Sequence, residues 1–251
     1  MASPGVAGVG GVLSADIAVP EHERELRFYS RVLTTGERPL WREDLMNSGG
    51  VPIIGLGERK PAHADLPLQW MPHIQVADVA ASAERALSRG GNALMRHEDD
   101  QWAVLSDPNG ATFGIVPEVA SESIPPMEGG RISWLDLTVA DAAHTRDFYQ
   151  EVVGWSAEDV QMEDAAGPYA DYALCMPDGT AVAGVCHARG VNRDLPPVWL
   201  IYLPVGDLGE SLARARDEGG GVVAERKDSA GAHAYAVVRD PVGACFALVP
   251  G

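Results

Sequence analysis

One stretch that decides the fold occurs twice: DPNGATFGIVP at residues 107–117 returns as DPVGACFALVP at residues 240–250, with seven of eleven positions identical. A second repeat lies upstream, where Phe-Tyr at residues 28–29 returns at residues 148–149. The spacing between equivalent residues is 120 for the second repeat and 133 for the first. The chain therefore encodes one architecture twice, with short insertions in the second copy. A duplication of this kind predicts a fold with two copies of one architecture, even before single helices and strands are assigned.

The duplication predicts two domains, residues 1–118 and 131–251, joined by a linker at residues 119–130 that is rich in Pro, Ser and Gly.

The formal net charge of −17 disfavours nucleic acids and anionic membranes as partners. No apolar stretch reaches the ~20 residues of a membrane span, and the first residues do not read as a secretion signal. We therefore expect a cytoplasmic monomer or homodimer. Three cysteines without CxxC spacing disfavour a disulfide framework or a zinc site.

Each copy divides again into two units. In the first unit, apolar periodicity predicts a strand at 12–19, a helix at 21–33 and extended runs at 40–46 and 51–56. The order of strand, helix and three strands then restarts three times, and together these patterns predict four βαβββ units. The second copy carries a longer inserted loop, 156–172, which we expect to cover a ligand because long loops are often functional.

This order resembles the vicinal oxygen chelate superfamily, which includes glyoxalase I, extradiol dioxygenases, fosfomycin-resistance enzymes and bleomycin-binding proteins. The resemblance is carried by Ala140-Asp141, by DFYQEVVGW at 147–155 and by both Asp-Pro-x-Gly turns. Within the superfamily the chain is most similar to tandem glyoxalase-like proteins of actinobacterial type. The resemblance implies an α+β fold in which four βαβββ units form two half-open β-barrel cups flanked by helices. It also implies a small ligand on the concave face of a cup.

The resemblance further implies a divalent metal, held by His, Gln or Glu on the first strand of each unit and by Glu on the closing strand. In this chain the first-strand positions fall on Ser14, Met71, Trp134 and Leu200, and the closing-strand positions on Gly114 and Ala247. Such a set does not supply the ligands of a hard or borderline ion. We therefore expect no metal and no cofactor. This expectation depends on the assigned strand registers, because a shift of one residue would turn every side chain to the other face of the sheet.

Four polar residues are candidates to act in place of the metal. Asp16, His73, Asp136 and Tyr202 each lie two residues beyond a first-strand position, and strand alternation puts them on the same face as that position. A carboxylate beside a histidine or tyrosine can act as a general acid and base. The alternative is that Asp16 and Asp136 bind backbone groups or an arginine and stabilise the sheet.

Aromatic residues are candidates for ligand contacts, since the chain has six tryptophans and only four phenylalanines. Side chains that line a cup would stack on a flat ligand. The candidates are Trp70, Trp102, Trp134, Trp199, Tyr172 and Tyr235. For any one tryptophan the alternative is plain core packing, because tryptophan is usually largely buried.

Three hypotheses of function follow. The first is a metal-independent, glyoxalase-like protein that binds an apolar or aromatic metabolite or antibiotic, in secondary-metabolite biosynthesis or self-resistance. The second is a metal-free enzyme, such as a cyclase, isomerase, dehydratase or epoxide-opening hydrolase or hydroxylase, that uses the Asp, His and Tyr residues. The third is a metal-dependent dioxygenase or lyase with displaced ligands. The sequence does not decide whether the protein is an enzyme.

Overall fold

The structure, a computed structural model, describes residues 7–120, 124, 129–228 and 230–251. These residues group into two compact units. Unit 1 takes the described residues within 1–13, 71–124 and 134–199, and unit 2 takes those within 14–70, 125–133 and 200–251. Part of the linker expected at 119–130 lies outside the described residues.

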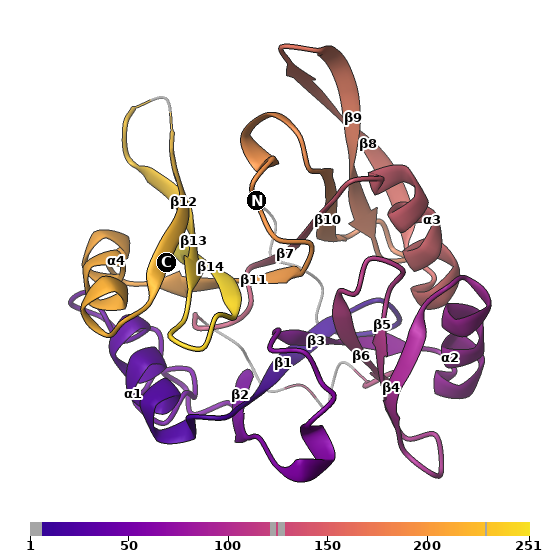
Figure 1. The fold of residues 1–251 in the computed structure, drawn as a ribbon, viewed down its shortest axis with the longest axis horizontal. Helices are drawn as coiled ribbons and strands as arrows, with labels where there is room; N and C mark the ends of the chain where they lie inside the picture. The colour runs from indigo at the N-terminus through magenta and orange to yellow at the C-terminus, as the bar shows by residue number, and fades with distance from the viewer. Residues whose placement is uncertain (1–6, 121–123, 125–128, 229) are drawn as a thin grey trace. The chain divides into compact units, whose positions relative to one another are not determined.

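Strands and helices follow one another in four successive modules (Figure 1). The first holds β1 (Val12–Val19), α1 (His22–Val32) and β2 (Ile54–Glu58). The second holds β3 (Met71–Val76), α2 (Val79–Ser88), β4 (Asn92–Arg96), β5 (Ala103–Ser106) and β6 (Thr112–Pro117). The third holds β7 (Trp134–Val139), α3 (Ala142–Val153), β8 (Ser156–Asp164), β9 (Gly167–Cys175) and β10 (Ala181–His187). The fourth holds β11 (Trp199–Val205), α4 (Leu208–Asp217), β12 (Gly221–Lys227), β13 (His233–Arg239) and β14 (Cys245–Pro250).

This recurrence confirms the predicted α+β tandem architecture. The strands of the described residues form one six-stranded and one eight-stranded sheet, and both sheets are open rather than closed into barrels. By contacts, unit 1 combines the second and third modules, and unit 2 combines the fourth module with the first from Ser14 onward. The division into residues 1–118 and 131–251 follows the sequence repeat and stays a prediction. Among the described residues, no helix is both long and apolar enough to cross a membrane.

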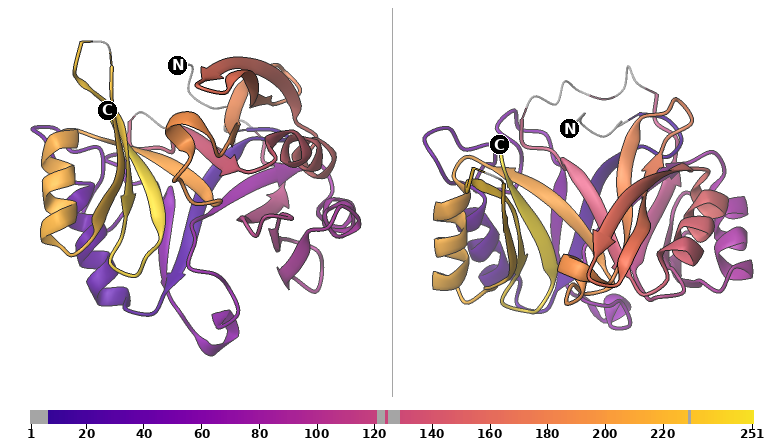
Figure 2. Two further views of the ribbon diagram at one scale, coloured as in Figure 1. Left: turned by 45° about the horizontal axis from the view of Figure 1, so that its top comes forward. Right: turned by 90° about the horizontal axis from the view of Figure 1, so that it is seen from above.

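Unit 1 contains two runs of four strands, in the orders β3-β6-β5-β4 and β7-β10-β9-β8. In each run the first two strands are parallel and the others antiparallel. Helices α2 and α3 pack on each other, as both views in Figure 2 show. Helix α3 begins where Asp141 accepts a hydrogen bond from the N–H of His144 (3.0 Å), and it ends at Gly154, which adopts a φ of 92°.

Unit 2 contains the parallel pair β1-β2 and the run β11-β14-β13-β12. Helices α1 and α4 pack on each other. The Ser211 hydroxyl of α4 donates to the carbonyl of Val32 at the end of α1 (2.8 Å) and lies 2.6 Å from the hydroxyl of Thr35. Both hydroxyl-bearing side chains are fully buried, so each has a partner in place of water.

A buried chain of hydrogen bonds holds the Asp-Pro-x-Gly turn of unit 2. Oδ1 of Asp240 accepts from the backbone N–H groups of Val242 (3.1 Å) and Ala244 (2.7 Å), which closes the turn. Oδ2 of Asp240 accepts from the hydroxyl of Tyr29 (2.9 Å), and Trp70 Nε1 donates to that hydroxyl oxygen (2.9 Å). Tyr29 and Trp70 are fully buried. The turn motif and the Phe-Tyr motif therefore belong to one buried structure.

Unit 1 repeats the same structure with its own residues. Oδ1 of Asp107 accepts from the N–H groups of Asn109 (2.8 Å) and Ala111 (2.9 Å). Trp199 Nε1 donates to the hydroxyl oxygen of Tyr149 (2.8 Å), and Tyr149 hydrogen-bonds to Asp107. The two repeats seen in the sequence are thus explained by one set of contacts that each unit makes once.

The first module departs from the predicted pattern. Periodicity predicts strands at 40–46 and 51–56, whereas the structure has only two isolated bridges before β2 begins at Ile54. Leu45 adopts a positive φ of 61°, which a strand does not allow. The indole N–H of Trp41 donates to a carbonyl oxygen of β11 (2.8 Å). The prediction of a strand at 40–46 is wrong because a local turn and the buried Trp41 determine the path of the chain.

The segment 156–172 also differs from its prediction as a loop. It forms β8 and most of β9, which pair without interruption from Ser156 with Cys175 to Asp164 with Gly167. The hairpin projects beyond helix α3 of the same unit (Figure 1). The prediction is wrong because the insertion lengthens two paired strands, whose backbone groups satisfy each other.

Candidate functional site

Neither His73 nor Tyr202 has a carboxylate beside it on the closing strand of its unit. His73 of β3 pairs in register with Gly114 of β6, and Tyr202 of β11 pairs with Ala247 of β14. Neither closing strand therefore presents a carboxylate at that register. A side chain added at Gly114 would place Cβ 2.7 Å from Cδ2 of His73. The imidazole ring thus occupies the space that a closing-strand glutamate would need.

The two candidate aspartates also lie beside glycines on the neighbouring parallel strand. Asp16 pairs with Gly55 in unit 2, and Asp136 pairs with Gly184 in unit 1. A Cβ atom at either glycine would overlap the Oδ1 atom of its aspartate. Each carboxylate therefore lies over its strand neighbour because that neighbour has no side chain.

The donor set does not fit the metal that the fold family implies. The six implied ligand positions hold Ser14, Met71, Gly114, Trp134, Leu200 and Ala247. Borderline and hard divalent ions take imidazole and carboxylate ligands, and this set offers neither. Within the described part of the chain, no three His, Cys, Asp or Glu side chains are grouped to hold a metal ion.

Two of the tryptophans predicted as ligand contacts lie in the core. Trp70 and Trp199 are fully buried, and their indole N–H groups are bound by Tyr29 and Tyr149. Each indole packs edge-on against its tyrosine, with ring centroids 5.4 Å and 5.1 Å apart. Core packing, the alternative stated above, therefore accounts for both, because neither ring has a face left for a ligand.

Trp134 is joined to a candidate carboxylate. Its Nε1 donates to Oδ1 of Asp136 (2.9 Å), and both side chains are partly exposed. Leu135 and Leu137, which alternate with them on β7, are fully buried. Alternation therefore puts Trp134 and Asp136 together on the open face of the strand.

The remaining aromatic candidates are spread over both units. Trp102 is partly exposed at the β4–β5 turn. Tyr172 of β9 is largely buried beneath the guanidinium of an α3 arginine, 4.4 Å from the ring centroid. Tyr235 of β13 packs against Tyr202, with ring centroids 5.6 Å apart. These three residues do not form one group with Trp134 in the contacts of either unit.

Each unit holds one candidate carboxylate and one candidate ring. Asp136 and His73 belong to unit 1, while Asp16 and Tyr202 belong to unit 2. The pairing of these residues in catalysis stays a prediction.

Sequence reasoning misses a polar group in unit 1, the β9–β10 cluster, which consists of Asp171, Cys186 and His187. Oδ1 of Asp171 accepts from the backbone N–H of His187 (2.7 Å) and lies 3.1 Å from Nδ1 of its ring. The side chain of Asp171 is 5% exposed and that of His187 is 22% exposed. A buried carboxylate thus orients a histidine that solvent still reaches. The sequence holds one signal, since Asp171 is the single charged residue in β9.

Cys186 connects this cluster to β7. Burial raises the pKa of the Cys186 thiol far above its usual range, and the charges of Asp136 and Asp171 raise it further. The thiol therefore stays protonated and hydrogen-bonds to Asp171. A protonated thiol is a poor nucleophile, so Cys186 serves as a hydrogen-bond partner of Asp171.

Aromatic and cationic side chains flank the cluster. The ring of Tyr169 packs edge-on against the imidazole of His187, at 5.8 Å and 88°. The guanidinium of Arg189 lies 4.0 Å from the centroid of the Tyr169 ring. Two hydrogen bonds to Asp164 (2.8 and 2.7 Å) hold Arg189, and they lower the pKa of Asp164 to about 2. Ring contacts and hydrogen bonds therefore hold the side chains that flank the cluster in place.

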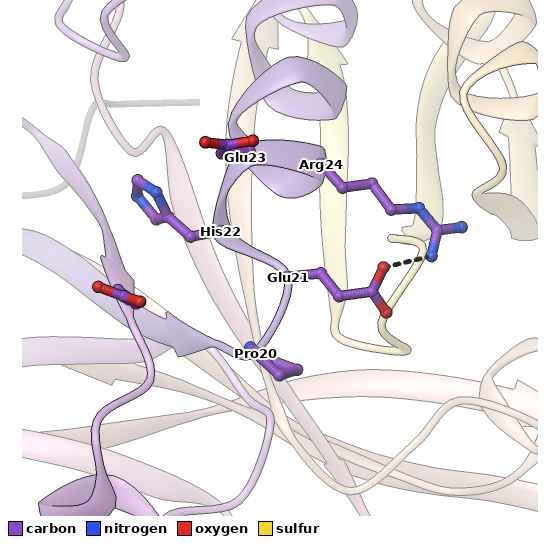
Figure 3. Close-up of a pocket in the computed structure, with 6 residues that line it drawn as sticks. Pro20, Glu21, His22, Glu23 and Arg24 are labelled. Carbon is purple, nitrogen blue, oxygen red and sulfur yellow. Dashed lines mark hydrogen bonds and ion pairs between the residues drawn. The ribbon is translucent and has the colours of Figure 1, made fainter.

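An open surface pocket lies at the start of α1 in unit 2 (Figure 3). It is lined by Pro20, Glu21, His22, Glu23, Arg24 and Glu58. Arg24 is paired with Glu21 (3.0 Å), and Nε2 of His22 donates to a carbonyl oxygen of β2 (3.0 Å). Three of its polar side chains, Glu21, His22 and Arg24, thus already have partners within the protein.

The family is shown by matches in both copies. Residues 14–116 match the family model of a glyoxalase-like domain. Residues 131–248 match that of the glyoxalase/bleomycin resistance protein/dioxygenase superfamily. The chain therefore belongs to this superfamily, in agreement with the vicinal oxygen chelate fold predicted from the repeats.

Two relatives carry informative names. The chain is 30% identical over 191 residues to CFP32 of Mycobacterium bovis, a candidate glyoxylase, and the match covers 73% of this chain and 70% of the relative. It is 31% identical over 131 residues to the anthracycline biosynthesis protein DauV of Streptomyces sp. (strain C5). That second match covers 47% of this chain and 46% of DauV.

Two solved dioxygenase structures align with this chain over nearly its whole length. An extradiol ring-cleaving dioxygenase from B. fuscum aligns with a TM-score of 0.58 at 12% identity, covering 100% of this chain and 74% of that one. The 2,2',3-trihydroxybiphenyl 1,2-dioxygenase of Sphingomonas wittichii aligns with a TM-score of 0.53 at 17% identity, covering 98% and 91%. At these identities the likeness shows the fold alone.

Proposed function

We propose that this protein binds a flat aromatic metabolite without a metal ion, in secondary-metabolite biosynthesis or self-resistance. The observation that carries the proposal is the pairing of His73 with Gly114 and of Tyr202 with Ala247. At both closing strands a residue without a donor atom stands where the resemblance implies a glutamate. A ring on the adjacent strand lies opposite each of these positions.

The open face of β7 supports an aromatic ligand. Trp134 is partly exposed, and its N–H is already bound by Asp136 (2.9 Å). An indole held in this way offers its apolar face to a flat ligand without leaving a polar group unpaired.

The name of one relative, DauV, supports the same class of ligand. DauV is named for anthracycline biosynthesis, and anthracyclines are built on flat fused rings. We extend to this chain the chemistry of the ring system, a polyaromatic compound with carbonyl and hydroxyl groups. The partner in this proposal is that small molecule, with no nucleic acid and no membrane.

A metal-free enzyme is the second candidate, and the partly exposed carboxylate of Asp136 beside Trp134 favours it. In such an enzyme Asp136 would take or give a proton at the bound substrate. Replacing Asp136 with Asn would then lower the rate ~10²-fold or more while leaving the affinity nearly unchanged. A loss of affinity alone would support the binding protein.

Quenching of tryptophan fluorescence tests the proposal, with 2-hydroxyanthraquinone and an anthracycline aglycone as probes. We expect saturable quenching, and we expect Trp134→Phe to weaken binding ~10-fold because the fixed indole is lost. Trp102→Phe is the matched control, since Trp102 lies at the β4–β5 turn of the same unit. Linear, unsaturable quenching by both probes would contradict the proposal.

A further inference from the structure

We infer that unit 2 holds a second ligand site, in which Tyr235 and Arg226 bind a flat aromatic carboxylate. The site goes beyond the proposed function, because it lies in the other unit and recognises a negatively charged group. It is built on the Tyr202 face, which is the face of the run β11-β14-β13-β12 that carries Tyr202.

Strand registers define the Tyr202 face. Tyr202 of β11 pairs with Ala247 of β14, and Val237 of β13 pairs with the same alanine. Phe246, the neighbour of Ala247, packs edge-on against a phenylalanine of α1. Because successive residues of a strand point to opposite faces of the sheet, the Tyr202 face is the one that α1 does not cover.

Tyr235 and Arg226 lie on this face as direct neighbours. Tyr235 stands two residues before Val237 on β13, and it pairs with Arg226 of β12. The register runs without a shift from the pair of Ala224 with Val237 to this pair, so both side chains share the face. Directly paired side chains begin about 5 Å apart. Both residues are partly exposed, and β12 is the edge strand of its sheet, so a ligand can reach them from solvent.

Two tyrosine rings form the aromatic part of the site. The ring centroids of Tyr202 and Tyr235 lie 5.6 Å apart, and the ring planes are inclined by 55°. Tyr202 is 6% exposed, whereas Tyr235 is partly exposed. Tyr202 therefore supports the ring of Tyr235, and Tyr235 offers a surface on which a flat ligand can stack.

Arg226 supplies the positive charge of the site. Its Nη1 donates to the carbonyl oxygen of Glu225 (3.2 Å), which holds the guanidinium close to the strand. The carboxylate of Glu225 contacts other basic groups, since its Oε1 lies 3.2 Å from Nδ1 of His233 and 3.9 Å from Nζ of Lys227. A guanidinium stays charged at neutral pH, and its parallel N–H groups match the two oxygens of a carboxylate. A planar acid stacked on Tyr235 therefore presents its carboxylate to Arg226.

The charge beside the exposed ring separates this site from the face proposed in unit 1. In unit 1 the indole of Trp134 is bound by the carboxylate of Asp136 (2.9 Å), which repels a negatively charged ligand. In unit 2 the paired neighbour of Tyr235 is a guanidinium. The two faces therefore select flat ligands by charge, with neutral polyaromatic compounds in unit 1 and aromatic acids in unit 2.

Two ligands of the same shape test the inference, namely 2-naphthoate and 2-naphthamide, which share one ring system and differ in charge. Titration calorimetry at about 0.15 M salt measures both affinities while the long-range field of the −17 net charge is screened. We expect the wild type to bind 2-naphthoate ~10-fold more tightly than 2-naphthamide. Arg226→Gln should remove this preference, and Tyr235→Leu should weaken the binding of both compounds. Arg239→Gln is the matched control, because it removes the same charge from an exposed position on β13.

The outcomes separate this inference from the proposed function. Equal affinities in the wild type, or a preference that survives in Arg226→Gln, overturn the inference, and so does a wild type that does not bind 2-naphthoate. The proposed function is tested separately by quenching with 2-hydroxyanthraquinone, which Arg226→Gln should leave unchanged.

Backbone amide resonances in NMR spectra of the wild type give a second test, which depends on no variant. We expect 2-naphthoate to shift the resonances of β12 and β13, and 2-hydroxyanthraquinone to shift those of β7. Shifts by 2-naphthoate that are confined to β7 would assign the acid to the face of Trp134 and overturn the inference.

Discussion

The two units contain the same buried Tyr–Asp–Trp structure but differ at the position beside it. In unit 1, Asn109 Nδ2 donates to Oδ2 of Asp107 (3.1 Å) and to the hydroxyl of Thr145 (2.9 Å). In unit 2 the equivalent residues are Val242 and Glu25. A neutral hydrogen-bonded pair in one unit is therefore replaced by an apolar residue and an acid in the other.

The acid in unit 2 is poorly accommodated. Glu25 is fully buried beside the carboxyl group of Asp240. Burial, followed by the charge of Asp240, raises the pKa of Glu25 to about 8. Both units keep the tyrosine, the aspartate and the tryptophan, so the duplicated structure depends on these three residues. The neighbouring position sets the charge of the core and is free to diverge.

Removing the turn aspartates should have the largest effect. Asp107→Ala leaves two buried donors without an acceptor, the N–H of Ala111 and the hydroxyl of Tyr149, which costs about 2–6 kcal/mol of unfolding free energy. Asp240→Ala should cost less, because it also removes the charge beside Glu25. Urea unfolding of both variants at about pH 8 measures the difference. Equal losses would contradict the proposed effect of the Asp240 charge on Glu25. Asn at either position keeps an acceptor and serves as the control.

Glu25→Gln should change how stability depends on pH. The pKa of Glu25 is about 8 in the folded protein against an ordinary value of 4.5, so between these values the folded state binds more protons than the unfolded state. The unfolding free energy of the wild type therefore falls as pH rises through this window, by about 1.4 kcal/mol per pH unit from this group. Below pH 4.5 both states are protonated and the penalty disappears.

Urea unfolding from about pH 4.5 to about pH 8 checks this slope. The Glu25→Gln variant should lose the contribution and be the more stable protein at the upper end of the range. Glu23→Gln removes the same charge from an exposed position on the same helix and should leave the slope unchanged. Parallel curves for the wild type and Glu25→Gln would show that Glu25 ionises normally.

Filling the space beside each candidate aspartate should show which of the two units binds the ligand. Gly184→Ala places a Cβ atom against Asp136 and displaces the carboxylate that holds Trp134, so we expect a ~10-fold loss of affinity for 2-hydroxyanthraquinone. Gly55→Ala makes the same change beside Asp16 and should leave the affinity unchanged. The opposite result would assign the ligand to the face of unit 2.

Transplanting the neutral pair should have the smallest effect. The double variant Glu25→Thr with Val242→Asn copies Thr145 and Asn109 of unit 1 into unit 2. The new hydrogen bond should contribute about 0.5–1.5 kcal/mol beyond the sum of the single changes, measured in a double-mutant cycle. A coupling energy of zero would show that the two units are not equivalent at this position.

Much of the fold is predictable because apolar alternation and turn residues act locally. The strand at 12–19 is observed at the predicted residues, and the helix predicted at 21–33 is observed at 22–32. The segments 40–46 and 156–172 differ from their predictions, because a positive φ at one residue and a long hairpin are set by contacts outside the local pattern.

The site is less predictable for the same reason. Asp136 follows from alternation along one strand, whereas the contact of Asp171 with His187 depends on the pairing of β9 with β10, which includes a register shift between Ala181 and Ala183. Such a shift decides which side chains meet, and no spacing along the chain reveals it. His187 therefore looks like one scattered histidine among several until the strands are paired.

A ligand titration shows whether binding needs a metal ion. The purified chain is dialysed against a chelator, and 2-hydroxyanthraquinone is titrated with and without added Zn²⁺, Mn²⁺ or Fe²⁺. The account predicts the same dissociation constant in every case, because Gly114 and Ala247 leave the closing strands without a ligand atom. Binding that is lost on chelation and restored by a stoichiometric metal ion would contradict it.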